Sequence, residues 1–269
     1  MEHVTVHEAA VPALGLGTYP MKGEDCRVAV RTALELGYRH IDTAQMYTNE
    51  AAVGDAIAAA PVDRDDVFLV TKVLSENLAE DDLRRSVDAS LDALNTTIDL
   101  LLIHSPNRSV PIAESIGAMN QLQERGDVEH IGVSNFSVDQ LEAAMAASTT
   151  PILTNQVEYH PFERRDDLLA FCLDNEVMLT AYSPLARGRV TGDDTLERIG
   201  DRYDKTAAQV VLRWLLQQEL VSAIPKAARR THQAENLDVF DFELTPEEMA
   251  AIFDLGGGLV DRLRRRLGL

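Results

Sequence analysis

Cysteines and long apolar runs are scarce in this chain of 269 residues. The only two cysteines, Cys26 and Cys172, lie far apart and show neither CxxC nor metal-type spacing. Two such thiols cannot form a disulfide framework, so we interpret both as small buried hydrophobic residues. No apolar stretch reaches the roughly 18 residues that a membrane-spanning helix needs. Because the N-terminus also lacks the basic and apolar regions of a secretory signal, we expect a soluble cytoplasmic protein.

Lysine is also rare, and positive charge is outweighed by negative charge. Only four of the 25 cationic residues are lysines, and the formal net charge is −19. This charge argues against a nucleic acid or an anionic membrane surface as partner. An acidic, lysine-poor surface is typical of proteins in a salt-rich cytoplasm, where screening removes self-repulsion. The sequence therefore suggests a halophilic protein, although an acidic protein from a GC-rich genome would have the same composition.

Short apolar runs alternate with amphipathic stretches along the chain. Their near-continuous apolar character is typical of strands that are covered on both faces. The predicted strands are Leu14–Gly17, Arg39–Asp42, Val67–Lys72, Ile98–His104, His130–Ser134, Ile152–Val157, Val177–Tyr182 and Val221–Ile224.

Apolar residues at spacings of three and four predict helices between these strands. The clearest are Asp81–Leu94, Ile112–Arg125, Val138–Ala147, Arg164–Asn175, Thr206–Gln218 and a C-terminal helix at Pro246–Leu255. Alternation of strands and helices implies parallel pairing with right-handed crossovers. Eight strands and no glycine-rich dinucleotide-binding turn favour a closed (β/α)8 TIM barrel over an open doubly wound sheet. Without a linker or low-complexity tract, residues 1–269 are predicted to form one domain.

Four polar residues stand at or just after the ends of predicted strands. Asp42 ends the second strand, Tyr47 follows it, Lys72 ends the third strand and His104 ends the fourth. Each alone has an ordinary explanation as a cap, a rim aromatic, a surface charge or a core histidine. In a barrel, however, the carboxyl ends of all strands meet at one mouth, where active sites are built. The four side chains are therefore expected to converge.

Such a set suits proton donation to a carbonyl group. A tyrosine with a pKa near 10 is a poor acid at neutral pH, but an adjacent ammonium favours the phenolate and lowers that pKa. Lys72 can supply the charge if an anion such as Asp42 keeps it protonated. His104 can then orient the carbonyl oxygen. We expect Tyr47 to be the proton donor.

At this point the sequence resembles the aldo-keto reductase family. The stretch from Gly37 to Glu50 is similar to the first signature of the family, with Asp42 and Tyr47 at its catalytic positions. Lys72 and His104 match the other two members of the family's catalytic tetrad. The resemblance covers essentially the whole chain and is nearest to the prokaryotic 2,5-diketo-gluconate reductase-like branch. Its further motifs are IGVSNF at 131–136, NQVEYHP at 155–161, AYSPLARG at 181–188 and IPK at 224–226.

The resemblance implies a nicotinamide cofactor and assigns residues to it. Ser134, Asn135 and Gln156 would hold the nicotinamide carboxamide, and Tyr182 would stack on the ring to fix the face that delivers hydride. Lys226 would face the adenosine phosphate. The other positions that match cofactor contacts are Ser183, Leu185, His232, Glu235 and Asn236.

Departures from the family pattern concern the cofactor phosphate and the substrate. Ala227 replaces the usual serine after Lys226, and His232 replaces the usual arginine in the loop that follows. Histidine is mostly neutral at pH 7, so we expect NADPH to be preferred modestly and NADH to be accepted. Tyr19 and Ser105 stand where tryptophan is common, at positions that line the substrate pocket beside His104. The physiological substrate therefore does not follow from the family.

Two other function classes are less well supported. A metal-dependent barrel hydrolase would need HxH or HExxH spacing, which the seven histidines do not show, so no metal is expected. A non-catalytic subunit that senses dinucleotide would not need the intact tetrad. We therefore predict an NAD(P)H-dependent reductase of aldehydes, ketones or keto-sugars. Its only expected partner is the small carbonyl substrate, and the chain is expected to be a monomer.

Overall fold

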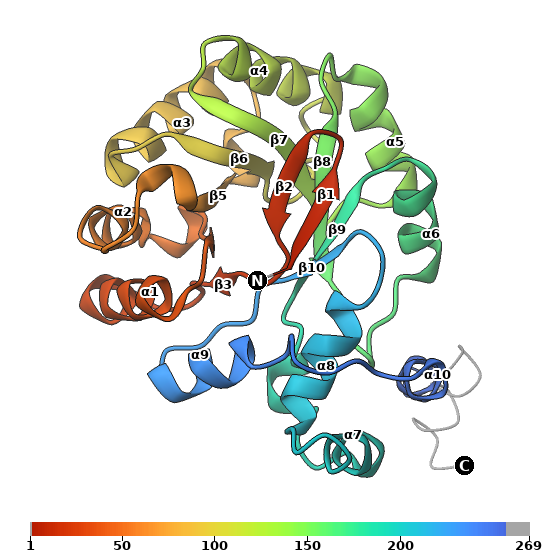
Figure 1. The fold of residues 1–269 in the computed structure, drawn as a ribbon. Coiled ribbons are helices and arrows are strands. Elements are labelled where there is room, and N and C mark those ends of the chain that lie inside the picture. The colour runs from red at the N-terminus through yellow and green to blue at the C-terminus, as the bar shows by residue number, and fades with distance from the viewer. Residues whose placement is uncertain (1, 257–269) are drawn as a thin grey trace.

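The protein forms a barrel with a short hairpin across one end (Figure 1). The structure is a computed structural model, and it describes residues 2–256. The hairpin pairs β1 (His3–Val6) with β2 (Ala9–Pro12) in antiparallel register. It covers the end at which the barrel strands begin, so the opposite end stays open for the loops that follow the strands.

Eight parallel strands form the barrel wall. They pair in the order in which they occur along the chain, each with its neighbours. Their bounds are β3 (Leu16–Gly17), β4 (His40–Asp42), β5 (Phe68–Val73), β6 (Ile98–Ile103), β7 (Val128–Ser134), β8 (Ile152–Glu158), β9 (Met178–Tyr182) and β10 (Val221–Ala223).

Backbone hydrogen bonds join the first and last strands and close the barrel. The N–H of Gly15 donates to Ala223 O at 2.9 Å, and the N–H of Ala223 donates to Ala13 O at 2.9 Å. Gly17 is needed at this seam, since a Cβ atom there would lie 2.7 Å from Ile224 O. The predicted TIM barrel is confirmed.

Helices surround the barrel and bury the outer faces of its strands (Figure 1). Buried aliphatic residues recur at helical spacing on α3 and α8, which explains why these helices could be predicted. The helices are α1 (Gly23–Leu36), α2 (Glu50–Ala58), α3 (Glu80–Leu94), α4 (Ile112–Glu124), α5 (Val138–Ala147), α6 (Asp166–Asp174), α7 (Asp194–Gly200), α8 (Ala207–Leu216), α9 (Arg230–Leu237) and α10 (Pro246–Asp254).

The predicted strands and helices agree with the structure to within about two residues. The β1–β2 hairpin was not predicted, because its strands have only four residues each. The segment after Lys226 was expected to be a loop, whereas residues Arg230–Leu237 form α9. That helix has only two buried residues, Gln233 and Asn236, so no apolar periodicity reveals it. The predicted domain extends to residue 269, and residues 257–269 lie outside the described part.

Candidate active site

A buried ion pair lies at the open end of the barrel. Lys72 Nζ donates to Asp42 Oδ1 at 2.5 Å and to Thr43 O at 2.8 Å. The other carboxylate oxygen of Asp42 accepts from Gln156 Nε2 at 2.8 Å. Both members of the pair are at most 2% exposed, so each charge has lost its water and depends on the other.

Lys72 stays cationic in this environment. Burial is the largest single influence and would lower the pKa of its ammonium group, but the charges and hydrogen bonds of Asp42 and Tyr47 together raise that pKa more, and the net change is upward. Asp42 is therefore in a position to hold the charge on Lys72, as the sequence led us to expect.

Tyr47 lies next to this pair. It ends the 3₁₀ turn η1 (Gln45–Tyr47), and its ring centroid is 5.1 Å from Lys72 Nζ. The ring meets the edge of the His104 imidazole at a centroid distance of 5.8 Å and an interplanar angle of 85°. The structure therefore brings all four predicted tetrad residues together, although they come from three strand ends and one turn.

The net direction of the Tyr47 pKa differs from the expectation. Lys72 lowers the pKa of Tyr47 through its charge and a hydrogen bond, as predicted, but burial of the phenol raises it more, so the net pKa is raised from the ordinary value of a tyrosine. The expectation took account of the ammonium and not of the loss of water around the ring. Tyr47 is consequently protonated throughout the neutral range.

His104 is uncharged at neutral pH. Burial, reinforced by the positive charge of Lys72, lowers the pKa of His104 to about 4. Its Nδ1 atom is buried and has no hydrogen-bond partner within residues 2–256. An orphaned acceptor is less costly than an orphaned N–H, so this favours the tautomer that carries its proton on Nε2.

The rim of the site contains Tyr19 and Ser105, which with His104 are the three predicted substrate contacts. Tyr19 is 57% exposed, and its ring centroid lies 5.1 Å from that of Tyr47. Ser105 donates to the backbone oxygen of His104 at 2.7 Å and accepts from Asn135 Nδ2 at 3.2 Å. One side of the rim is therefore aromatic and the other side is polar.

The predicted carboxamide-binding residues are connected to the tetrad. Asn135 Nδ2 donates to His104 O at 2.9 Å and to Ser134 Oγ at 3.0 Å. The hydroxyl of Tyr182 donates to Asn135 Oδ1 at 3.0 Å, and Ser134 Oγ donates to Gln156 O at 2.8 Å. These four residues form a continuous polar shelf along the ends of β7, β8 and β9, next to His104.

The remaining predicted cofactor residues form a separate group. Lys226 follows β10, and His232 and Glu235 are exposed on α9, whereas Asn236 is buried. Ser183 and Leu185 lie in the turn after β9, where each accepts a backbone hydrogen bond. Within residues 2–256, no side-chain hydrogen bond or ion pair joins this group to the tetrad.

Two arginines at the start of α9 are candidates to supply the positive charge that His232 does not give to a cofactor phosphate. Arg230 is engaged by Glu35, with an N–O distance of 3.3 Å. Arg229 is exposed at the N-cap of α9, and that cap has no side-chain hydrogen bond. Arg229 and Lys226 are therefore the better placed cations at this end of the helix.

Two partly buried polar residues near the tetrad, Gln45 and Glu50, had no predicted role. Gln45 donates to Ser90 Oγ at 3.0 Å and accepts from Leu74 N at 3.0 Å. Glu50 accepts from Thr71 Oγ1 at 2.5 Å, and burial raises the pKa of its carboxyl group. Their only signal in the sequence is the run of polar residues after Asp42, which is also part of the stretch that resembles the family signature.

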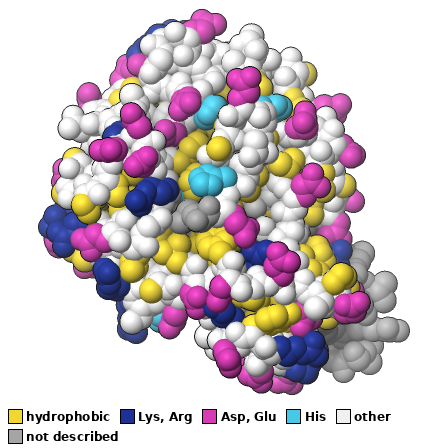
Figure 2. Space-filling model, viewed as in Figure 1, with side chains coloured by type: hydrophobic (Ala, Val, Ile, Leu, Met, Phe, Trp, Pro, Cys, Tyr) yellow, Lys and Arg dark blue, Asp and Glu magenta, His cyan; other side chains and the backbone are white. Residues whose placement is uncertain are grey.

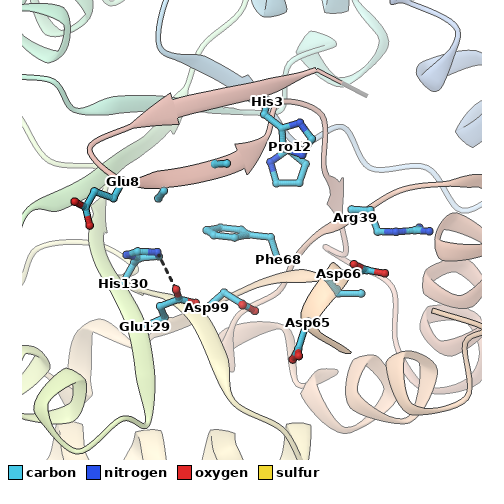
Figure 3. Close-up of a pocket in the computed structure, with 13 residues that line it drawn as sticks. His3, Glu8, Pro12, Arg39, Asp65, Asp66, Phe68, Asp99, Glu129 and His130 are labelled. Atoms are coloured by element: carbon cyan, nitrogen blue, oxygen red, sulfur yellow. Dashed lines mark ion pairs between the residues drawn. The ribbon is translucent and has the colours of Figure 1, made fainter. Parts of the chain in front are cut away.

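A cleft of about 700 Å³ lies at the opposite end of the barrel, between the hairpin and the strand starts (Figure 3). Phe68, His130 and several carboxylates line it, and none of the predicted site residues does. Figure 2 shows histidines and carboxylates around this face. This hollow is therefore distinct from the cluster of Asp42, Tyr47, Lys72 and His104.

Membrane-spanning segments and metal clusters are both missing from the described part of the chain. Residues 2–256 contain no helix long and apolar enough to cross a membrane. The same residues include no cluster of three or more histidine, cysteine, aspartate or glutamate side chains that could hold a metal ion.

Comparison with known proteins gives consistent results. The sequence profile of the Aldo/keto reductase family matches residues 13–256. Methylglyoxal reductase DkgB of Escherichia coli O157:H7 is 40% identical over 90% of this chain and 92% of its own length. A crystal structure described provisionally as 2,5-diketo-D-gluconic acid reductase B is 48% identical, covers 95% of this chain and 91% of its own, and superposes with a TM-score of 0.93. A Bombyx mori aldo-keto reductase crystallised with NADP is 32% identical over 95% of this chain and 94% of its own, with a TM-score of 0.87.

Proposed function

Because this chain belongs to the aldo/keto reductase family, we propose that it reduces carbonyl groups with a nicotinamide cofactor and with Tyr47 as the proton donor. The observation that carries the proposal is the contact of the Tyr47 ring with a buried, charge-balanced Lys72 and a neutral His104. An ammonium, a phenol and an imidazole beside one another can hold a carbonyl oxygen and supply its proton.

The chain's own residues fit a dinucleotide. Within the polar shelf, Tyr182 offers a half-buried aromatic ring beside the polar groups of Ser134, Asn135 and Gln156, which suits a ring that bears a carboxamide. At the far end, Lys226 and the uncapped N-terminus of α9 suit phosphate groups. When bound there, a reduced nicotinamide supplies the hydride.

The reaction then adds one hydride to the carbonyl carbon and one proton to the carbonyl oxygen. His104, protonated on Nε2, donates a hydrogen bond that orients this oxygen. The Tyr47 hydroxyl transfers its proton to the oxygen as negative charge develops there. Lys72 stabilises the phenolate that remains, and Asp42 keeps Lys72 charged while solvent returns the proton to Tyr47.

Tyr47→Phe tests this assignment because it removes only the proton donor. We expect turnover with methylglyoxal, the substrate named for relatives, to fall by about 10²–10⁴-fold. The Kd of NADPH, measured by quenching of protein fluorescence, should stay close to that of the parent. Steady-state rates within twofold of the parent would remove Tyr47 from the mechanism, and a parent that binds NADPH without turning over any aldehyde, ketone or keto-sugar would favour a sensor.

We further propose that NADPH is preferred only modestly over NADH. Lys226 retains one cation for the 2′-phosphate, but His232 provides neither the permanent charge nor the planar fork of an arginine. Losing one charge-assisted hydrogen bond costs roughly 1.5–3 kcal/mol, or about 10–150-fold in discrimination. Arg229 can compensate in part, since its side chain is exposed at the same helix end.

His232→Arg tests this cofactor proposal at fixed salt. The ratio of kcat/KM for NADPH to that for NADH should rise by about tenfold or more in the variant. An unchanged ratio would show that His232 lies outside the phosphate pocket.

A further inference from the structure

The turn that carries Tyr47 holds an unfavourable backbone conformation. Thr48, directly after Tyr47, has φ 51°, in the left-handed region that β-branched residues rarely adopt. Such a residue persists only where surrounding contacts fix it. The position of the Tyr47 ring therefore depends on what holds the two ends of this turn.

Asn49 ends the turn, and its side chain does not make the hydrogen bond that is usual at its position. It is the N-cap residue of α2, where an asparagine side chain normally accepts a hydrogen bond from the first turn of its own helix. In this protein the Asn49 side chain makes no such bond, although it is only 2% exposed. Its amide is committed to other groups.

Those groups lie on both sides of the catalytic tyrosine. Thr43, at the start of the turn, donates its hydroxyl to Asn49 Oδ1 at 2.5 Å. The backbone oxygen of the same Thr43 accepts from Lys72 Nζ at 2.8 Å. On the other side, Asn49 Nδ2 donates to Met21 O at 2.9 Å. Met21 follows Tyr19 by two residues, and Tyr19 packs on the Tyr47 ring.

We propose that Asn49 is a positioning residue that sets the Tyr47 turn against Lys72 and against the loop of Tyr19. The Oδ1 half of its amide closes the turn through Thr43, which itself holds the ammonium. The Nδ2 half fixes the loop that presents Tyr19 to the substrate. The inference rests on the proposed role of Tyr47 in proton transfer.

Thr43→Val and Asn49→Ala separate the two halves of this amide. Thr43→Val removes one hydroxyl and keeps the backbone oxygen that binds Lys72, so it loosens the turn alone. We expect kcat to fall by about tenfold with little change in the KM of methylglyoxal. Asn49→Ala releases both sides, so kcat should fall at least as far and KM should rise. In the double variant the losses in kcat should not multiply, since both substitutions break the same hydrogen bond between Thr43 and Asn49.

Thr154→Val is the matched control. Thr154 is a fully buried barrel threonine whose hydroxyl donates to Met178 O at 2.8 Å. This variant should lose a comparable amount of thermal stability while kcat and KM stay within twofold of the parent. A purely structural role for Thr43 would make the two valine variants equivalent in activity.

A kcat within twofold of the parent for Thr43→Val would overturn the proposal, even if Asn49→Ala fails to fold. Losses in kcat that multiply in the double variant would also overturn it. Tyr47→Phe is measured in the same assay. If Tyr47→Phe is slow and Thr43→Val is not, only the positioning role fails. If Tyr47→Phe retains the parental rate, the proposed function fails and the positioning role falls with it.

Discussion

The two ends of the barrel each contain a carboxylate paired with a cation, and the two pairs differ in what surrounds them. Lys72 and Asp42 lie at the open end, and Arg64 and Asp99 lie at the end covered by the hairpin. The N–O distance is 2.5 Å in both pairs. Distance alone therefore does not distinguish a candidate catalytic pair from a structural one.

The covered pair uses its hydrogen-bonding capacity to hold the fold. Arg64 donates to Thr96 Oγ1 at 2.8 Å, to Val67 O at 2.6 Å and to Thr97 O at 2.7 Å, in addition to Asp99. A guanidinium group has five N–H donors in a fixed plane, and here four hydrogen bonds use it. Arg64 thereby ties the start of β5 to the start of β6.

The open pair leaves one ammonium donor of Lys72 for Tyr47. An ammonium group has three donors, and Asp42 and Thr43 occupy two of those of Lys72. The remaining charge acts on Tyr47, whose pKa it lowers against the effect of burial. An ammonium donor beside a protonated phenol, rather than the ion pair itself, therefore distinguishes the proposed reactive end of this barrel from the covered end.

Lys72→Met, at the open end, should have the largest effect. It removes the charge that stabilises the Tyr47 phenolate, so kcat for carbonyl reduction should fall by about 10³-fold. It also leaves Asp42 buried without a counter-charge, which destabilises the fold by about 3–5 kcal/mol. The double variant Lys72→Met/Asp42→Asn should recover much of the stability and none of the activity, measured by chemical denaturation and initial rates.

Arg64→Met removes the structural pair, so it should lower the stability of the fold and leave kcat almost unchanged. Asp99 and three polar acceptors lose their donor, so we expect a loss of about 2–3 kcal/mol in unfolding free energy, since the pair is only partly buried. Because this end of the barrel is remote from Tyr47, kcat at 25 °C should stay within twofold of the parent. A tenfold loss of kcat in a folded variant would contradict the separation of the two ends.

The pH dependence of kcat/KM reports the protonation states at the open end. His104, with a pKa of about 4, loses its neutral form only in acid, and Tyr47, whose pKa burial raises from its ordinary value, loses its proton only in strong base. The reduction rate should therefore be flat from about pH 6 to 9. A break near pH 6.5, the ordinary pKa of histidine, would show that His104 is not shielded as the structure indicates.

The lowered pKa of His104 also predicts how this residue changes the stability of the protein with pH. Its folded pKa lies below its unfolded value of about 6.5, so the unfolded chain binds more protons between these pH values. The His104 contribution should therefore destabilise the protein progressively as pH falls from about 6.5 toward 4. Comparing the Tm of the parent with that of His104→Gln at pH 7.5 and 5 isolates it, and a difference that does not change with pH would contradict this sign.

Added salt should have the smallest effect on stability. It distinguishes the contribution of surface charges from that of the two ion pairs. If the net charge of −19 reflects adaptation to salt, Tm should rise by a few degrees as NaCl increases to 1 M, since the Debye length falls from about 10 Å to about 3 Å. The Lys72–Asp42 pair is buried and should not respond. A Tm that stays flat or drops over this range would count against the halophilic interpretation.

The sequence predicts the barrel and the convergence of the tetrad because both follow from local pattern. Parallel strands end at one mouth, so the positions of Asp42, Lys72 and His104 along the chain are enough to place them together. The direction of the Tyr47 pKa could not be predicted, because burial of the ring depends on packing by His104 and Tyr19, which are distant in sequence.

The contacts that surround the tetrad could not be predicted from the sequence either. Asn49 has the position of an ordinary helix cap, and only the structure shows its amide turned toward Thr43 and Met21. The α9 helix, with His232 on an exposed turn, escaped prediction because almost none of its side chains is apolar and buried.

The coupling between Lys72 and Tyr47 decides whether the proposed mechanism holds, and it is obtained by measuring kcat/KM for Lys72→Met in the parent and again in a Tyr47→Phe background. If Lys72 acts on the carbonyl through the Tyr47 hydroxyl, its substitution costs about 10³-fold in the parent and at most a few-fold once that hydroxyl is gone. Equal losses in the two backgrounds would show that Lys72 and Tyr47 act independently, and the mechanism proposed for this barrel would be wrong.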